Sequence, residues 1–248
     1  MAAPLIVGVI PARYSSTRLP GKALADIEGV PMVVRVWRQA SRARALNRVV
    51  VATDDERIAR AVSAVGGEAM MTASTHQSGT DRIAEVAVRV PADIYVNVQG
   101  DLPFIEPADL DALVAPMRVD AGIAMATLAT PIVDAAQWRN PAVVKVVCDE
   151  RGNALYFSRA AIPWPRDDSG PPAQARRHIG VYAYRRDLLL SFARLEPGVL
   201  ERIEKLEQLR VLEHGLPIRV VASVAPSLEV DTPEDLARAR EQAQRPGS

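Results

Sequence analysis

The stretch LIVGVIPARYSSTRLPGK, residues 5–22, joins a short apolar run to a loop that is rich in cations and hydroxyl groups. The run Leu5–Ile10 carries no charge and several β-branched residues, which is typical of a strand buried on both faces of a sheet. The loop that follows contains Arg13, Arg18 and Lys22. Charged side chains and backbone amides of this kind can wrap a polyphosphate. The stretch therefore predicts a buried first strand that ends at an anion site.

Similar short apolar runs recur along the chain, and stretches with helical spacing separate them. The further predicted strands are Arg48–Ala52, Ile94–Val98, Gly122–Thr130, Val143–Val147 and Arg219–Val224. Apolar residues three and four positions apart predict amphipathic helices over Pro31–Ala45, Glu56–Val65, Asp81–Val90 and Leu200–Glu213. This alternation predicts an α/β fold with a mostly parallel sheet.

Composition excludes several classes of protein. The 248 residues are 48% hydrophobic, enough to bury a large core, and 30 basic side chains balance 30 acidic ones. No overall basic field is available for non-specific nucleic-acid binding, so we expect no nucleic-acid partner. Cys148 is the single cysteine, which favours a reducing compartment, the cytoplasm. The six apolar residues near the N-terminus fall far short of the ~20 that span a bilayer, so we expect no membrane segment.

The segment 162–175 contains four prolines and is predicted to be a loop inside the domain. Three interpretations stay open for it: a flexible lid, an arm that reaches a partner subunit, and a plain surface loop.

Polar residues follow three of the predicted strands. Thr53–Asp55 come after the second strand and Gln99–Asp101 after the third, in addition to the cationic loop after the first. Ligands of open parallel sheets collect at the carboxyl ends of strands, so these groups are expected to face one site. The loop is not a P-loop, because Ser16 and Ala23 stand where that motif needs Gly and Ser or Thr. The sequence has no GxGxxG, which excludes a dinucleotide-dependent oxidoreductase.

The pattern RYSSTRLPGK directly after the first strand resembles the signature of the sugar nucleotidyltransferases. Further segments narrow the resemblance to the 3-deoxy-manno-octulosonate (Kdo) cytidylyltransferase family: VATDDERIARAV, HQSGTDRIAEV, YVNVQGDLPFI, ALYFSRAAIPW, RHIGVYAYRRDLL, ERIEKLEQLRVLEHG and EVDTPEDL. The resemblance implies a Rossmann-like nucleotidyltransferase fold in one domain. Within that domain it implies a nucleotide-binding part at about 1–130, a smaller sugar-binding and dimerisation part at about 131–225, and a C-terminal helix at 233–243.

The activity implied by this family is attack of the anomeric hydroxyl of Kdo on the α-phosphorus of CTP. The products are CMP-Kdo and diphosphate, and the pathway is lipopolysaccharide biosynthesis. The resemblance also implies Mg²⁺ as cofactor and a homodimer. Such a transfer depends on positioning and on cations that spread negative charge.

The resemblance assigns site residues by motif. The implied catalytic group is Arg13, Lys22, Asp101 and Asp231, of which the two aspartates are the implied Mg²⁺ ligands. The implied nucleotide-binding residues are Pro11, Ala12, Arg13, Arg18, Lys22, Ser78, Gly79, Arg82 and Asp101. The implied substrate-binding residues are Arg18, Gln99, His178, Tyr182, Glu207 and Gln208.

Local structure is also expected around several of these residues. Thr232 and Pro233 predict a helix start that places Asp231 between a strand and a helix. Helical spacing directs Ile203, Leu206 and Leu209 toward the core, with Glu207 and Gln208 beside that stripe. From sequence alone, an isolated His178 is more often structural than functional.

Leu102 departs from the family pattern, which usually reads Gln-Gly-Asp-Glu-Pro where this chain has QGDLP. One acidic group close to the implied metal is therefore missing. Two alternatives stay open: a cytidylyltransferase for another 2-keto sugar acid, such as 8-amino-Kdo or a nonulosonic acid, and a CTP-binding protein without catalysis.

Overall fold

A computed structural model describes residues 3–16, 18–76, 78–167, 170–192, 194–225 and 227–245. Thr17 and Gln77 of the quoted motifs, and residues 168 and 169 of the proline-rich loop, lie outside the described residues. The chain divides into two compact units, one formed by Met1–Asp111 with Pro226–Ser248 and the other by Ala112–Ala225. The single-domain assignment remains a prediction.

The first unit is built on four parallel strands in the order β6 (Ile94–Asn97), β1 (Ile6–Ala12), β4 (Arg48–Thr53) and β5 (Glu68–Met71). The predicted strands in this part of the chain are confirmed, and so is their parallel arrangement. Strand β5 was not predicted. Its sequence, EAMM, contains no β-branched or aromatic residue that would signal a strand.

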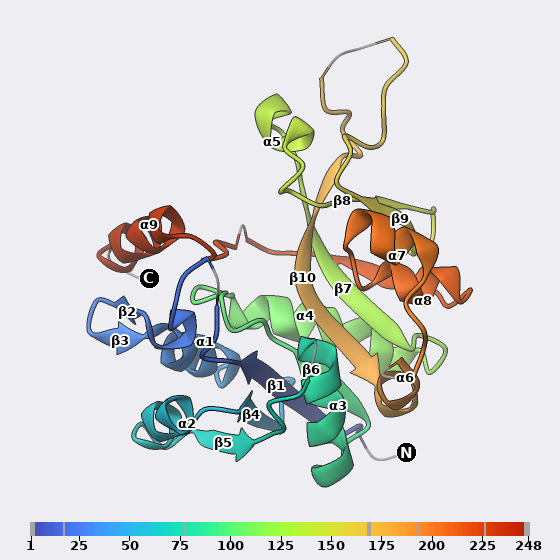
Figure 1. The fold of residues 1–248 in the computed structure, drawn as a ribbon. Helices are drawn as coiled ribbons and strands as arrows, with labels where there is room; N and C mark the ends of the chain where they lie inside the picture. The colour runs from blue at the N-terminus through green and yellow to red at the C-terminus, as the bar shows by residue number, and fades with distance from the viewer. Residues whose placement is uncertain are drawn as a thin grey trace. The chain divides into compact units, whose positions relative to one another are not determined.

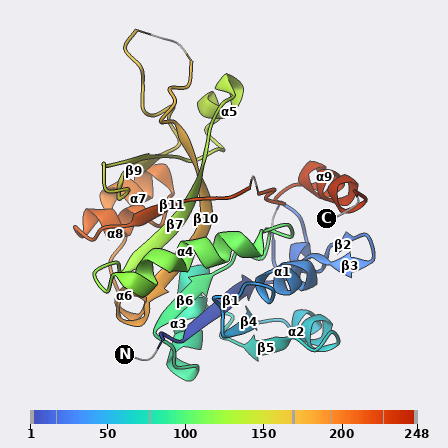
Figure 2. The same cartoon turned by 180° about the vertical axis from the view of Figure 1, so that it is seen from behind.

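Helices α1 (Met32–Ala40), α2 (Glu56–Ser63) and α3 (Gly79–Arg89) connect these strands and confirm three predicted helices. The chain runs outward from β1 through β4 to β5 and then returns past β1 to β6. Because such crossovers are right-handed, this reversal places α1 and α3 on opposite faces of the strands (Figures 1 and 2). A crevice is expected at the carboxyl ends of β1 and β6, where the direction of winding changes.

The C-terminal segment returns to the first unit. Helix α9 (Pro233–Ala243) begins at the N-cap Thr232, whose side chain and that of Asp235 form a capping box, as the helix prediction required. Residues 227–231 before it form no strand, so the predicted strand at this junction is wrong. Val230 and Leu236 instead pack with Ile27, Met32 and Phe104.

Three short elements complete this unit: η1 (Lys22–Leu24) and a hairpin of β2 (Asp26–Ile27) and β3 (Val30–Pro31). Helix α4 (Pro107–Val119) begins in the first unit and ends in the second.

The second unit is mainly antiparallel. Strand β7 (Met125–Pro131) pairs with β10 (Arg176–Arg185) antiparallel and with β11 (Arg219–Ala222) parallel. Strand β8 (Lys145–Cys148) pairs with β10 and with β9 (Ala154–Ser158). Strands β7, β8 and β11 confirm predictions, whereas β9 and β10 were not predicted as strands.

Two short helices, α5 (Ala135–Arg139) and α6 (Arg186–Phe192), flank this sheet. The described residues of the 162–175 loop form no helix or strand, as predicted. The base of the loop is held by Trp138, whose ring stacks on Trp164 at 5.4 Å and whose Nε1 donates to the carbonyl of Ile162 at 3.3 Å.

The predicted helix over Leu200–Glu213 is wrong as a continuous element. It consists of α7 (Val199–Glu204) and α8 (Leu209–Glu213), which are separated because Lys205 has a left-handed backbone with φ of 55°. Leu206 and Leu209 are buried as expected, but Ile203 is 71% exposed. Among the described residues, no helix combines the length and the apolar character needed to cross a membrane.

Candidate active site

A cavity of about 340 Å³ lies at the carboxyl ends of β1 and β6, within the first unit. Every site residue predicted in this unit lines it: Pro11, Ala12, Arg13, Arg18, Lys22, Ser78, Gly79, Arg82, Gln99, Asp101 and Asp231. The fold thus brings together residues from both ends of the chain. The roles assigned to them remain predictions.

Lys22 is the cation that contacts both aspartates in the cavity. Its Nζ lies 2.7 Å from Asp101 Oδ2 and 2.9 Å from Asp231 Oδ1, while Arg18 contacts the other oxygen of Asp231 at 2.9 Å. Burial alone lowers the pKa of Lys22, but the charges and hydrogen bonds of the two carboxylates outweigh burial and raise it above its ordinary value. Lys22 is therefore a cation at neutral pH.

Asp231 reaches the cavity because the segment before α9 passes beside the end of β6. The backbone N–H of Val230 donates to the carbonyl of Asp101 at 2.9 Å, and the Val230 side chain is fully buried. Its neighbours Glu229 and Asp231 both line the cavity. Glu229 was not predicted, although its position two residues before Asp231 in an extended segment was a usable signal.

The three carboxylates can supply oxygen ligands to a cation. One oxygen from each of Asp101, Glu229 and Asp231 lies within 4.8 Å of the others. The second oxygen of Asp101, Oδ1, is buried and has no hydrogen-bond partner among the described residues. An unpaired buried carboxylate oxygen is costly, so this atom is suited to a ligand that the protein alone does not supply.

The turn after β6 explains two features of the sequence. A Cβ at Gly100 would lie 3.0 Å from the carbonyl oxygen of Pro11, so only glycine allows β1 and this turn to approach so closely. Leu102 is 3% exposed and does not belong to the described lining of the cavity. The departure from the family pattern therefore places an apolar side chain in the core.

Helix α3 presents its N-terminus to the cavity. Ser78 is the N-cap, and its hydroxyl accepts from the backbone N–H of Asp81 at 3.1 Å while the Asp81 carboxylate accepts from the N–H of Ser78. Ser78 and Gly79, at the start of this helix, line the cavity. The positive end of the helix dipole therefore favours anions there.

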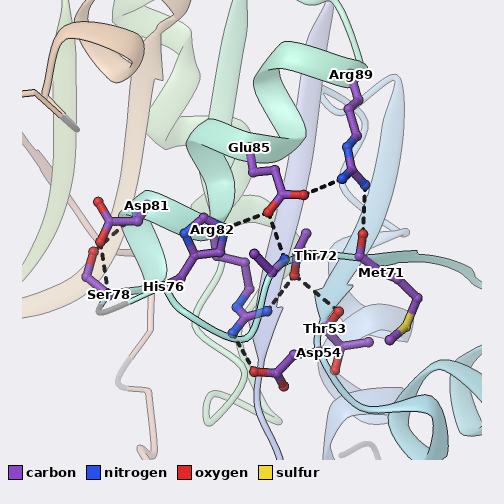
Figure 3. Close-up of polar contacts among 11 residues, drawn as sticks. Thr53, Asp54, Met71, Thr72, His76, Ser78, Asp81, Arg82, Glu85 and Arg89 are labelled. Carbon is purple, nitrogen blue, oxygen red and sulfur yellow. Dashed lines mark hydrogen bonds and ion pairs between the residues drawn. The ribbon is translucent and has the colours of Figure 1, made fainter.

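Arg82 is buried on the same side, and other side chains hold it in place (Figure 3). Its guanidinium contacts Asp54 at 2.9 Å and the hydroxyl of Thr72 at 2.5 Å, and that hydroxyl donates to the carbonyl of Thr53 at 3.1 Å. The sequence indicated Asp54 only as one of the polar residues that follow the second predicted strand. The structure shows that it orients Arg82.

His76 also lines the cavity and was not assigned a role from the sequence. Its Nε2 lies 2.5 Å from Glu85, which accepts from the backbone N–H of Ala73 and pairs with Arg89 (Figure 3). Burial raises the pKa of Glu85, but the hydrogen bonds from Ala73 and His76 and the charge of Arg89 lower it overall. Glu85 is thus an anion that fixes the imidazole.

The remaining predicted substrate residues lie in the second unit. His178 is buried, and its Nε2 lies 2.9 Å from the hydroxyl of Thr127, which also lies 2.9 Å from the carbonyl of Val181. Burial, and then the charge of Arg177, lower the pKa of His178 to about 3. The imidazole is therefore neutral, and it donates to Thr127 if that hydroxyl donates to Val181.

Aromatic and amide groups surround this histidine. The rings of Phe157 and Tyr182 lie 4.9 Å and 5.4 Å from the ring of His178. Glu207 and Gln208 occupy the turn between α7 and α8 instead of a helix. Gln208 is 5% exposed, and among the described residues its Nε2 has no partner.

Comparisons with known proteins agree with one another. A family model described as "Cytidylyltransferase" matches residues 7–219. The chain is 55% identical to a 3-deoxy-manno-octulosonate cytidylyltransferase of Syntrophotalea carbinolica, over 94% of this chain and 96% of that protein. It is 53% identical to the protein of the same name from Geobacter metallireducens, over 97% and 98% of the two chains.

Solved structures give the same result. A structure of CMP:2-keto-3-deoxy-manno-octonic acid synthetase complexed with CTP superposes with a TM-score of 0.92 at 47% identity, covering 96% of this chain and 98% of the other. A 4-diphosphocytidyl-2C-methyl-D-erythritol synthase from Anaerococcus prevotii superposes with a TM-score of 0.65 at 14% identity, covering 97% and 96%, which shows a shared fold alone.

Proposed function

This chain belongs to the 3-deoxy-manno-octulosonate cytidylyltransferase family, and from this membership and the cavity chemistry we infer its reaction. It is a nucleotidyltransferase that transfers CMP from CTP to Kdo, giving CMP-Kdo and diphosphate. Kdo is the sugar acid of lipopolysaccharide, so the product serves lipopolysaccharide biosynthesis. The expected fold class, a Rossmann-like nucleotidyltransferase, is confirmed.

The observation that carries this conclusion is the arrangement of cations and carboxylates around Lys22. Arg13, Arg18 and Lys22 line one side of the cavity, and the N-terminus of α3 adds a further positive end. These groups are suited to hold the triphosphate and to stabilise the charge that moves onto the leaving diphosphate. Arg82 is held rigidly enough to position the nucleoside.

For the cofactor we propose Mg²⁺, held by Asp101 and Asp231 with Glu229 beside them. A hard cation of this kind prefers carboxylate and phosphate oxygens, and it would neutralise charge on the reacting phosphate. The buried unpaired oxygen of Asp101 supports this assignment. Lys22, which contacts both aspartates, would be free to pair with the triphosphate if a cation took over the charge of these carboxylates.

For the sugar acid we propose binding groups in the second unit: His178, Tyr182, Glu207 and Gln208. The buried amide of Gln208 supports this proposal, because a sugar hydroxyl would satisfy it. His178 is neutral, so it would act as a hydrogen-bonding group and not as a cation. A different 2-keto sugar acid is the second candidate substrate.

We further propose a cytoplasmic homodimer. Val199 and Ile203 of α7 are 67% and 71% exposed, and Leu155 of β9 is 63% exposed, so these apolar side chains are accessible to a second copy of the chain. Sedimentation velocity on the wild type and on Ile203→Glu tests this assignment. A wild-type monomer at micromolar concentration would contradict it.

The activity is tested by measuring diphosphate release from CTP and Mg²⁺ with Kdo, 8-amino-Kdo or N-acetylneuraminate. We expect the fastest turnover with Kdo. Asp101→Asn should lose at least about 100-fold in rate, a loss of the size seen when one charge-stabilising group is removed, whereas the exposed Asp167→Asn serves as a control without effect. No release with any of the three acids, despite CTP binding, would favour a binding protein without catalysis.

A further inference from the structure

The first unit contains a second cavity, of about 520 Å³, along helix α1. Its described lining residues come from α1 and the turn behind it, from Val30, and from Pro103 and Phe104, and none of them lines the first cavity. The volume lies within the range of small-molecule sites, about 300–1,000 Å³. The transfer reaction does not use this cavity.

Three arginines, Arg35, Arg38 and Arg42, line this cavity, whose walls are otherwise mainly apolar. Arg35 and Arg38 lie three positions apart on α1 and are neighbours on its surface. Arg42 lies in the turn after the helix, where its guanidinium donates to the side-chain oxygen of Gln39 at 2.8 Å. Among the described lining residues there is no carboxylate. Burial lowers the pKa of Arg35 and the charge of Arg38 lowers it further, although Asp26 and Glu28 oppose this effect. An anion would relieve the repulsion between these cations.

The innermost arginine is already fixed in place. Arg35 Nε donates to the carbonyl of Ile27 at 3.0 Å, and its guanidinium carbon lies 6.0 Å from the centre of the Phe104 ring. Trp37, Phe104 and Pro103 give the cavity apolar walls. A flat ring can stack on such walls, whereas an inorganic anion would leave them unused.

From this combination we propose that the second cavity binds a nucleoside diphosphate or triphosphate. The phosphates lie between Arg38 and Arg42, which present exposed, charged donors. The base lies against Trp37. This site is separate from the cytidylyltransferase site and does not depend on its activity.

The proposal is tested by counting CTP sites with equilibrium dialysis and by following tryptophan fluorescence. We expect two sites per chain in the wild type, of which the second quenches Trp37. In the double variant Arg38→Gln, Arg42→Gln, the second site should weaken by about 100-fold, because two charge-assisted contacts are lost. The first site should remain, which also shows that the variant is folded. Arg44→Gln, an exposed arginine that does not line the cavity, should keep both sites.

Three results would overturn the proposal. The first is a single CTP site in the wild type, and the second is a second site that the double variant retains at full affinity. The third is inorganic diphosphate that binds at the second site as tightly as CTP, with the same sensitivity to the double variant. That result would show that the cavity binds anions in general and that its aromatic walls do not contribute to binding.

Discussion

Lys22 shows how a single residue can serve two states of the site. The sequence assigns it to the triphosphate, and the structure places its Nζ between Asp101 and Asp231. In this position the lysine neutralises carboxylates that would otherwise repel each other. The ammonium group that would bind the nucleotide therefore also keeps Asp101 and Asp231 close together in the absence of nucleotide.

A Lys22→Met variant separates these two roles. Without the ammonium group, the aspartates should bind a divalent cation more tightly in the absence of nucleotide, by about tenfold, whereas CTP should bind at least about tenfold more weakly. Titration with Mn²⁺, followed by electron paramagnetic resonance, measures the first effect, and calorimetry measures the second. Lys205→Met, a change of an exposed lysine in the second unit, is the matched control. Unchanged Mn²⁺ affinity in Lys22→Met would show that the lysine does not compete with a cation.

The roles of the residues that line the cavity remain predictions, but the motifs that carry the family resemblance selected residues that the fold brings together. The motifs did not identify the residues that support the site. Asp54 orients Arg82, and Glu85 holds His76, through contacts that join different elements. Glu229 belongs to no motif, and only its spacing of two residues from Asp231 indicated it. Supporting contacts of this kind depend on tertiary structure, which residue type and spacing alone do not reveal.

The regular parallel strands and the capped helices were predictable, and the exceptions have physical causes. The prediction of a continuous helix over 200–213 is wrong because Lys205 adopts a left-handed backbone. Lysine is not a residue type that signals this conformation. Strand β10 was not predicted, although apolar and polar residues alternate along its sequence. It also carries a register shift between Ile179 and Tyr182, which interrupts the simple pattern.

The break between α7 and α8 leads to a prediction about stability. A non-glycine residue in the left-handed region costs roughly 1–2 kcal/mol, and glycine avoids most of this cost but loses more chain entropy on folding. We expect Lys205→Gly to raise the free energy of unfolding by about 0.5–1 kcal/mol, and Lys205→Ala to leave it unchanged or lower it slightly. Urea denaturation of the three proteins provides the comparison. If the glycine variant is no more stable than the alanine variant, the backbone at this residue is not strained.

The first unit is built from two segments that lie at opposite ends of the sequence. Residues 226–248 belong to the first unit, although they follow the whole second unit in the sequence. The hydrogen bond from Val230 to Asp101 joins residues that are far apart in sequence, and this contact brings Asp231 to Lys22. The cavity therefore requires both ends of the chain, and we expect that removing the C-terminal segment abolishes CTP binding at this site.

The stability of the molecule should depend on pH through His178. The folded protein keeps this imidazole neutral down to a pH of about 3, whereas in the unfolded chain its pKa returns to 6.5. Between these values the unfolded state binds more protons, so the free energy of unfolding is fully retained above pH 6.5 and falls as the pH decreases toward 3. The slope is up to about 1.4 kcal/mol per pH unit. Urea denaturation between pH 7.5 and 5 should show this slope in the wild type and in His214→Gln, in which an exposed histidine is changed. In His178→Gln the slope should be shallower by about 1 kcal/mol per pH unit whatever the absolute stability of the variant, and equal slopes in all three proteins would mean that His178 titrates normally.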